Sequence, residues 1–459
     1  MLPAFRGFTA DALPYALRAR GNWKAGVWNI EFMHANLGDA KLDVKGRVSG
    51  VPDAPVAAMS VRLDAPSLAR LGEFRGRRLA DQPLTLVADL SDDADVQQAD
   101  SLSVQLGSSD LNGRVRMQPG TPPKLELALH SRQLHPFSLF PATESTDDQS
   151  GPPAEQPRDH VLPDTPLPLE ALRRLNATVN LDISELHLRR TTWREVRLNA
   201  VLQDGALQID DFQTHGVDGT LSGHLELIPV DDAGRLALGL DANELRLALL
   251  TADKEELQAM PHASFHLDLT ATGANIRELA SGLDGNGWLA SSGGRVPNQT
   301  LGGLFFGDFF GELLTTLNPF IKKEPYTEIA CIAMPFVAEH GQLQSSPAFV
   351  IQTDKVNIIS RGSIDLSTEK LDLNFKTQAR KGIGLSAGQF INPFLKVAGT
   401  LSDPQLVLDP AGTLVTGGAA VATAGISILA TTAWNRVFRA KDPCAAVMKA
   451  HQKQMDEVQ

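Results

Sequence analysis

The sequence predicts a mainly β protein in which short antiparallel strands repeat and stack into a long sheet with one apolar face. Apolar residues fall on every second position of many short runs, which is the pattern of half-buried strands. Turn residues such as Asp204-Gly205 and Asp218-Gly219 separate these runs at short intervals, as β-hairpins require. One phrase also recurs, as VAGTLSDPQLVLDP (397–410), VDGTLSGHLELIPV (217–230), VKGRVSG (from Val44) and LNGRVRM (from Leu111).

The recurring phrase has a direct physical interpretation. We expect one strand to end at the glycine, which tolerates a tight bend, and the next strand to carry a single apolar stripe until a proline stops it. Repetition of this unit places all apolar side chains on one side of the sheet. That face must be covered by a second sheet, by helices or by something that is not protein.

Composition and charge limit the classes of function. The 459 residues are 42% hydrophobic and 21% charged, which is typical of an ordered protein. The net charge of -12 argues against nucleic-acid binding, because affinity for phosphates needs clustered Lys and Arg. Only 6% of residues are aromatic, so the apolar surface is mostly aliphatic.

The chain divides into four predicted regions. Residues 1–140 carry the strand alternation, for example in Lys41 to Val48 and Leu84 to Leu90. Residues 141–168 are rich in Pro, Ser and acidic residues, which predicts a disordered linker or solvated loop. Residues 169–410 repeat the alternation most clearly, and residues 411–459 predict an amphipathic helix followed by a polar tail.

Alternating aliphatic residues are the candidates for the apolar face. An ordinary sandwich core is the other interpretation of the same residues. The candidates are Leu221, Leu225, Leu227, Leu236, Leu238, Leu240, Ile364, Leu366, Leu371, Leu373 and Phe375.

Three stretches break the strand pattern and predict helices. Asn275 to Leu283 predicts a short helix, and residues 301–318 place Phe306, Phe309 and Phe310 at helical spacing, for core packing or for contact with a ligand or membrane. The third helix begins after Asp409-Pro410 and has a wide small-residue and aliphatic face. Either a membrane or the protein's own sheet would cover this face. The stretch ends with Trp434, Arg436 and Arg439, an aromatic residue followed by basic residues, which is the pattern of an anchor at a membrane interface.

The sequence predicts no enzyme, cofactor or metal site. GLSAG, Gly384 to Gly388, fits a nucleophile motif around Ser386, but the only histidine after it is His451, in the predicted polar tail. The 11 histidines form no close cluster with Cys or Asp. Cys331 and Cys444 lack zinc-site spacing, and they permit either one disulfide or two free thiols.

Several phrases in a fixed order carry a resemblance to a known family. They are VLQDGALQI, VDGTLSGHLEL, GLDGNGWLASSGG, RGSIDLSTEKLDL and VAGTLSDPQLVLDP, between Pro166 and the tail near Cys444. In these phrases the chain resembles the C-terminal region of AsmA-type proteins. The resemblance implies a repeating β-groove, a curved U-shaped antiparallel sheet with an apolar concave face, similar to bridge-like lipid transfer proteins.

The resemblance implies a non-enzymatic role in the Gram-negative cell envelope. Its expected partners are phospholipid, membrane, and inner- or outer-membrane proteins, and its expected location is the periplasm with an inner-membrane anchor. The aliphatic candidates would line a lipid groove that conducts phospholipid and supports outer-membrane biogenesis. A periplasmic location also favours a disulfide between Cys331 and Cys444. The family's usual N-terminal membrane helix is not seen in this chain.

An alternative role is a periplasmic scaffold or chaperone for outer-membrane protein assembly. A groove for lipid should lack ordered polar groups at its floor. A groove for peptide should instead leave a free edge strand, because extended peptides bind by adding a strand to a sheet.

Overall fold

The protein is mainly β, with 69% of the described residues in strands and 9% in helices, which confirms the predicted fold class. The structure is a computed structural model that describes residues 8–10, 13–50, 56–74, 76–93, 96–137, 160–188, 191–216, 218–246, 258–297, 326–380, 395–408, 437 and 440–458. The chain forms two compact units. Unit 1 contains Met1–Gly151 and Pro168–Gly216, and unit 2 contains Pro152–Leu167 and Val217–Gln459.

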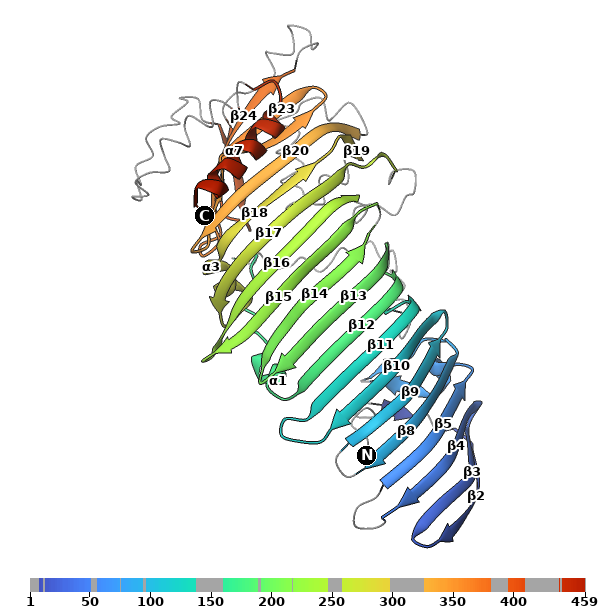
Figure 1. Ribbon diagram of the computed structural model, residues 1–459. Helices are drawn as coiled ribbons and strands as arrows, with labels where there is room; N and C mark the ends of the chain where they lie inside the picture. Colours follow the sequence, from blue (N-terminus) through green and yellow to red (C-terminus); the bar gives the residue numbers. More distant parts are fainter. Residues whose placement is uncertain are drawn as a thin grey trace. The chain divides into compact units, whose positions relative to one another are not determined.

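Unit 1 is built on a sheet of hairpin-connected strands that lie side by side in chain order (Figure 1). The strands are β2 (Tyr15–Lys24), β3 (Val27–Leu37), β4 (Ala40–Ser49), β5 (Val56–Ala65), β8 (Leu84–Asp93), β9 (Val96–Leu106), β10 (Ser109–Gln118), β11 (Lys124–Leu134), β12 (Asn176–His187), β13 (Thr192–Gln203) and β14 (Ala206–His215). A small separate sheet joins β1 (Phe8–Ala10), β6 (Gly72–Phe74) and β7 (Arg77–Arg78). Two short helices, η2 (Leu68–Arg70) and α1 (Leu169–Leu172), complete the unit.

One strand pair in unit 1 departs from the predicted antiparallel order. β11 and β12 pair in parallel, with Leu127 opposite Val179 and Leu129 opposite Leu181. Parallel neighbours need a long connection that returns the chain to the same end of the sheet. The segment between β11 and β12 has that length, so the expectation of antiparallel pairing throughout was wrong at this place.

Unit 2 is also a sheet of sequential antiparallel strands. They are β15 (Thr220–Val230), β16 (Ala233–Arg246), β17 (His262–Gly273), β18 (Asp284–Ser291), β19 (Gly294–Pro297), β20 (Tyr326–Glu339), β21 (Gln342–Ser345), β22 (Phe349–Thr353), β23 (Val356–Asp365), β24 (Lys370–Ala379), β25 (Leu395–Gly399) and β26 (Pro404–Leu408). β20 pairs with both β18 and β19, and with both β21 and β22. The predicted helix at Asn275 is confirmed as α3 (Ile276–Ser281), whose first turn the Asn275 side chain caps.

Glycines of the recurring phrase lie where two strands approach each other closely. Gly113 in β10 has a φ of 147°, and a Cβ atom added there would lie 2.0 Å from the carbonyl oxygen of Ala128 in β11. Gly362 in β23, outside the recurring phrase, has the same conformation, with a φ of 154° and an added Cβ atom 1.9 Å from Asp372 O. Both glycines lie inside strands, whereas Gly399 ends β25 as the sequence predicted.

The helix α7 (Pro443–Val458) covers part of the unit 2 sheet. Asp442 caps it, since its Oδ1 accepts a hydrogen bond from the backbone N–H of Ala445 at 3.0 Å. Val447 is fully buried in a cluster with Ala333, Val350 and Ile359 of the sheet. A disulfide between Cys331 of β20 and Cys444 of α7 joins the same two elements. The predicted C-terminal helix is therefore present, but it lies in the segment that was expected to be a polar tail, because one face of that segment is apolar and buried.

We expect Gly113→Ala to destabilise unit 1 by about 2–3 kcal/mol, because the methyl group must displace a neighbouring backbone carbonyl. Urea unfolding followed by circular dichroism measures the effect. Gly26→Ala is the matched control, because Gly26 also has a positive φ, of 80°, but has no atom within 4 Å of an added Cβ. Equal losses in the two variants would contradict the argument from close approach.

We expect the docking of α7 to weaken as the pH falls below the ordinary histidine pKa of about 6.5. Burial lowers the pKa of His451, which is 3% exposed. An undocked helix therefore takes up the proton first, and docking loses stability on acidification. Hydrogen exchange of residues 443–458 at pH 7.5 and 5.5 measures this.

Two variants test whether His451 causes this pH dependence. In His451→Gln, which cannot gain this charge, exchange should depend less on pH than in the wild type. In His130→Gln, an exposed position on β11, the pH dependence should match the wild type. The attribution to His451 fails if His451→Gln leaves the pH dependence unchanged.

Candidate apolar sheet face

An unbroken apolar row crosses the unit 2 sheet. Directly opposed residues of paired strands project from the same face, so the strand register defines which side chains are neighbours. Starting at Leu225 in β15, the row continues strand by strand to β24. Its members, which we call the Leu225 row, are Leu225, Leu238, Leu269, Gly285, Ala338, Leu343, Ile364 and Leu371.

The candidate aliphatics of unit 2 lie on the face of the Leu225 row. Leu227 opposes Leu236 in the next row, and Leu221 and Leu240 belong to further rows of that face. Leu373 opposes Gly362 and Val397, and Phe375 opposes Leu395. The alternation therefore placed these residues correctly relative to one another. Leu366 alone lies just beyond a strand, after the end of β23.

Burial differs along this face. All six candidate leucines of β15 and β16 are half-buried. At the β23–β25 end, Phe375 is only 5% exposed and packs with Val356, Ile358, Leu395 and Val397. Leu371 and Leu373 pack against that cluster. The first part of the face thus offers accessible aliphatic surface, whereas the second part is a packed core.

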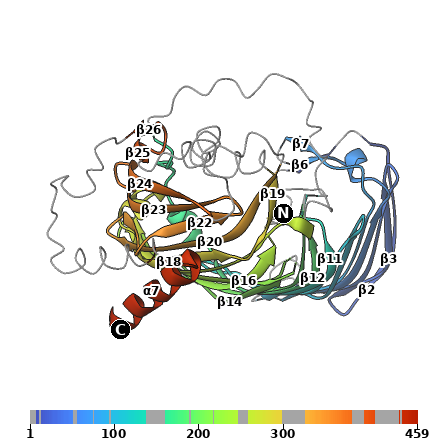
Figure 2. The ribbon, with the colours of Figure 1, turned by 90° about the horizontal axis from the view of Figure 1, so that it is seen from above.

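The apolar face is the side of the unit 2 sheet that α7 does not cover. Three residues of the cluster that α7 joins pair with one another across β20, β22 and β23, namely Ala333, Val350 and Ile359. Along these strands they alternate with Ile332, Ile351 and Ile358, which belong to the apolar face. Figure 2 shows α7 on the outer side of the curved strands of unit 2. The apolar face therefore lies on the inner side of that curve.

Unit 1 repeats this arrangement with its own residues. An apolar row crosses every strand of the main unit 1 sheet, from β2 to β14. It consists of Ala19, Met33, Val44, Val61, Ala88, Leu102, Gly113, Leu129, Leu181, Leu198 and Phe212. None of these residues was among the site candidates predicted from the sequence. Their signal was the same period-two alternation, which is present both in residues 1–140 and in residues 176–215.

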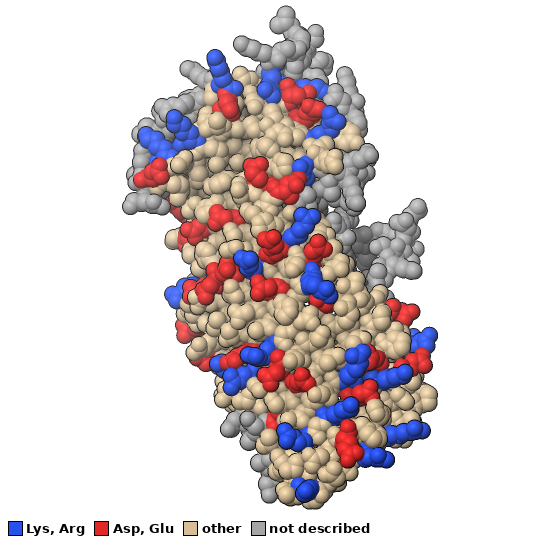
Figure 3. All heavy atoms as spheres, turned by 45° about the vertical axis from the view of Figure 1, so that its right-hand side comes forward, with Lys and Arg blue, Asp and Glu red and all other residues tan. Residues whose placement is uncertain are grey.

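The next row along the unit 1 strands is almost entirely polar and projects from the opposite face. Its members are Arg18, His34, Asp43, Arg62, Val87, Ser103, Asn112, His130, Asp182, Arg197 and Gln213. Opposite charges face each other along it, with Arg62 opposite Asp43 and Arg197 opposite Asp182. On the face that Figure 3 presents, Lys and Arg are likewise interspersed with Asp and Glu. This face is suited to water.

A polar cluster lies where β11, β12 and β13 end. The imidazole rings of His135 and His187 stack at 4.4 Å, and His187 Nδ1 and Nε2 lie 3.1 Å from Thr192 Oγ1 and 3.0 Å from Gln133 Nε2. Burial, and then the proximity of His187, lower the pKa of His135. The neutral form of His135 is therefore favoured, and the cluster forms a polar margin to the apolar face of unit 1.

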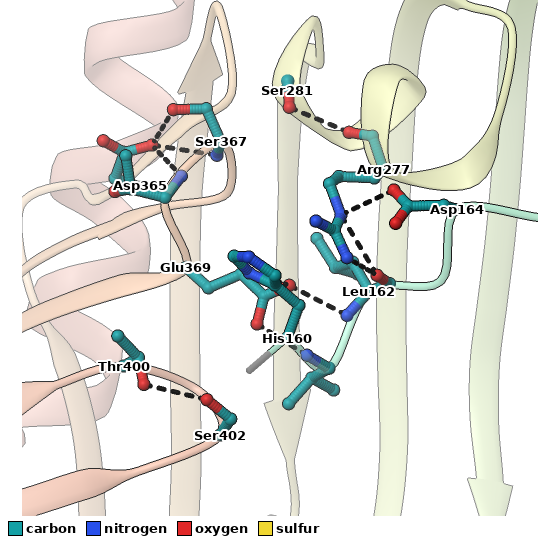
Figure 4. A network of polar contacts seen from close by, with 12 residues as sticks. His160, Leu162, Asp164, Arg277, Ser281, Asp365, Ser367, Glu369, Thr400 and Ser402 are labelled. Carbon is teal, nitrogen blue, oxygen red and sulfur yellow. Dashed lines mark hydrogen bonds and ion pairs between the residues drawn. The ribbon is translucent and has the colours of Figure 1, made fainter. Parts of the chain in front are cut away.

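A segment of the predicted linker, residues 160–167, is held against unit 2, and we call it the strap (Figure 4). The side chain of Glu369 is fully buried, and its carboxylate accepts hydrogen bonds from the backbone N–H groups of Val161 and Leu162 at 2.7 and 2.9 Å. Arg277 of α3 donates to the carbonyl of Leu162 and pairs with Asp164 at 3.0 Å. The strap is mostly exposed, as predicted for a solvated loop, and polar anchors hold it in place of apolar burial.

The turn before Glu369 is itself shaped by hydrogen bonds. Asp365 Oδ1 accepts from the backbone and hydroxyl of Ser367 and from the backbone of Thr368. Burial opposes ionisation of Asp365, but these hydrogen bonds outweigh it and hold its pKa at about 2. The carboxylate is therefore ionised at neutral pH, which fixes the turn that presents Glu369.

Other predicted site residues fall outside the described part of the chain. They are Phe306, Phe309 and Phe310 with their helix 301–318, Ser386 with its GLSAG motif, and Trp434, Arg436 and Arg439. Within the described ranges, no group of three His, Cys, Asp or Glu residues could hold a metal ion. Among those same residues, no helix has both the length and the apolar character needed to cross a membrane.

Comparison with known proteins gave no match. No protein-family model, curated protein or solved structure resembles the chain significantly.

We expect Glu369→Ala to release the strap, because two backbone donors lose their buried acceptor. Hydrogen exchange of residues 160–168 should accelerate by at least about tenfold, the equivalent of about 1.4 kcal/mol. Glu339→Ala removes an exposed carboxylate from the end of β20 and is the matched control. Unchanged exchange in Glu369→Ala would contradict an anchoring role for this carboxylate.

Proposed function

We propose that the apolar sheet faces bind the acyl chains of phospholipid, and that the protein is a non-enzymatic carrier or conduit for lipid in the cell envelope. The observation that carries this proposal is the uninterrupted apolar row in each unit, backed by half-buried leucines in β15 and β16. Burial of each methylene contributes about 0.8 kcal/mol, whether protein or lipid covers it.

The chemistry of the floor favours acyl chains over polar ligands. Across β15, β16 and β17 the apolar face presents Leu, Ala, Phe and Gly, without a charged side chain in the rows of Leu221, Leu225 and Leu227. Aliphatic side chains without fixed hydrogen-bond groups suit a mobile hydrocarbon ligand. A polar ligand would instead need convergent donors and acceptors at the floor.

The disulfide between Cys331 and Cys444 supports an envelope location. Such bonds form and persist in oxidising compartments, including the periplasm, and are rare in the cytosol. The two cysteines are 113 residues apart in the sequence, so the bond ties α7 to a distant strand. The proposal places the protein in the periplasm, in agreement with the AsmA-like phrases of its sequence, and leaves the membrane partners to be found by experiment.

Native mass spectrometry with lipid extraction tests the proposal. We expect phospholipid to copurify with the wild-type protein and its amount to fall about tenfold or more in Leu225→Asp/Leu238→Asp, because carboxylates replace two adjacent leucine side chains that would touch hydrocarbon. A milder variant, Leu225→Ser/Leu238→Ser, should lose part of the lipid and keeps the test valid if the first variant does not fold.

The matched control adds two carboxylates to the same sheet but on the opposite face. In Ile228→Asp/Thr272→Asp the new charges flank Arg235, and bound lipid should remain at the wild-type amount. A wild-type protein that carries no lipid, or equal lipid in the folded apolar-face variants and this control, would refute the proposal.

A further inference from the structure

The strand β2 has an exposed edge along its whole length. Among the described residues it pairs with β3 alone, and all ten of its residues are exposed. Tyr15, Leu17 and Trp23 are 84%, 61% and 50% exposed, so large apolar side chains accompany the open edge. An edge strand of this kind presents a row of backbone donors and acceptors that can pair with another strand.

The usual protections of an edge strand are incomplete in β2. The strand is ten residues long and contains no proline. Its charged residues, Arg18, Arg20 and Lys24, all alternate onto one face, while Leu17, Ala19 and Trp23 belong to the other face. The apolar face of unit 1 therefore extends to the open edge, and β2 carries no charged side chain on that face that would prevent a further strand from extending it.

The charge pattern of β2 selects against a second copy of itself. Antiparallel pairing of two β2 strands that matches the apolar faces would bring the basic residues of both copies onto one face, where like charges repel. A shift by one residue would instead place the basic face of one copy beside the apolar face of the other. β2 contains no Asp or Glu that would relieve this repulsion.

We propose that β2 binds an extended segment of a partner protein by β-augmentation, and that this segment alternates apolar residues with Asp or Glu. Its backbone pairs with the open edge, its apolar side chains extend the row that ends at Ala19, and its carboxylates face Arg18 and Arg20. This interaction uses backbone groups and one basic face. It does not depend on the cargo of the apolar sheet faces.

Two synthetic peptides test the proposal on the full chain. One is a ten-residue peptide of alternating Leu and Glu, and the other alternates Leu and Lys at the same length. We expect the glutamate peptide to bind, as measured by fluorescence anisotropy, and to slow hydrogen exchange of residues 15–24. The lysine peptide should bind at least about tenfold more weakly, because cross-strand like charges are destabilising.

A charge reversal on the edge gives the decisive comparison. Arg18→Glu/Arg20→Glu should weaken the glutamate peptide about tenfold and strengthen the lysine peptide by a similar factor. Both arginine side chains are exposed, which limits the effect of the reversal on the fold, although it removes the cation–π contact of Arg20 with the Phe32 ring at 5.8 Å. Lys45→Glu/Arg47→Glu makes the same charge change on β4, which is paired on both sides, and should leave both affinities unchanged.

Three outcomes would overturn the proposal. Equal binding of the two peptides would remove the charge complementarity, and exchange protection outside residues 15–24 would place the binding elsewhere. A dimer in sedimentation that Arg18→Glu/Arg20→Glu abolishes would show that the partner of this edge is a second copy of the chain.

Discussion

Because side chains alternate between the two faces of a strand, a shift of one residue in any pairing would turn the apolar set of that strand to the polar face. The rows through Met33 in unit 1 and Leu225 in unit 2 exist only because every pairing along them keeps its register. Gly113 and Gly362 lie at close strand approaches, where any side chain would obstruct this register. A bulge between Ile30 and Met33 in β3 adds one residue, so that both of these side chains stay on the apolar face. Such bulges also bend the sheet.

Periodicity predicted the strands and the relative placement of Leu225, Leu238, Ile364 and Leu371, because the side-chain period of two is a property of the local chain. It could not predict that Phe375 is buried whereas Leu225 is half-buried, since burial depends on neighbours distant in sequence. The parallel pair β11–β12 was missed for the same reason. A C-terminal helix was predicted and α7 is one, but its bounds were missed, although Asp442-Pro443 is a start signal and Cys444, Val447, Met448 and His451 follow helical spacing.

The strap shows a different limit of sequence reasoning. Its composition is that of a solvated loop, and no apolar pattern marks it. It is held instead by Glu369, which is 207 residues from Leu162 in the chain and whose buried carboxylate satisfies two backbone donors. Such an anchor leaves no local signal, because its donors are main-chain groups that every residue type except proline supplies.

The two proposed ligands use different parts of the sheet, and so they need not compete. Lipid would contact side-chain methylenes on the apolar face, and affinity would grow with the apolar area covered. A partner strand at β2 would instead take its affinity from backbone hydrogen bonds and its selectivity from Arg18 and Arg20. An added strand would also place its own apolar side chains beside Ala19 in the unit 1 row. Binding at the edge would therefore lengthen the apolar face without covering it.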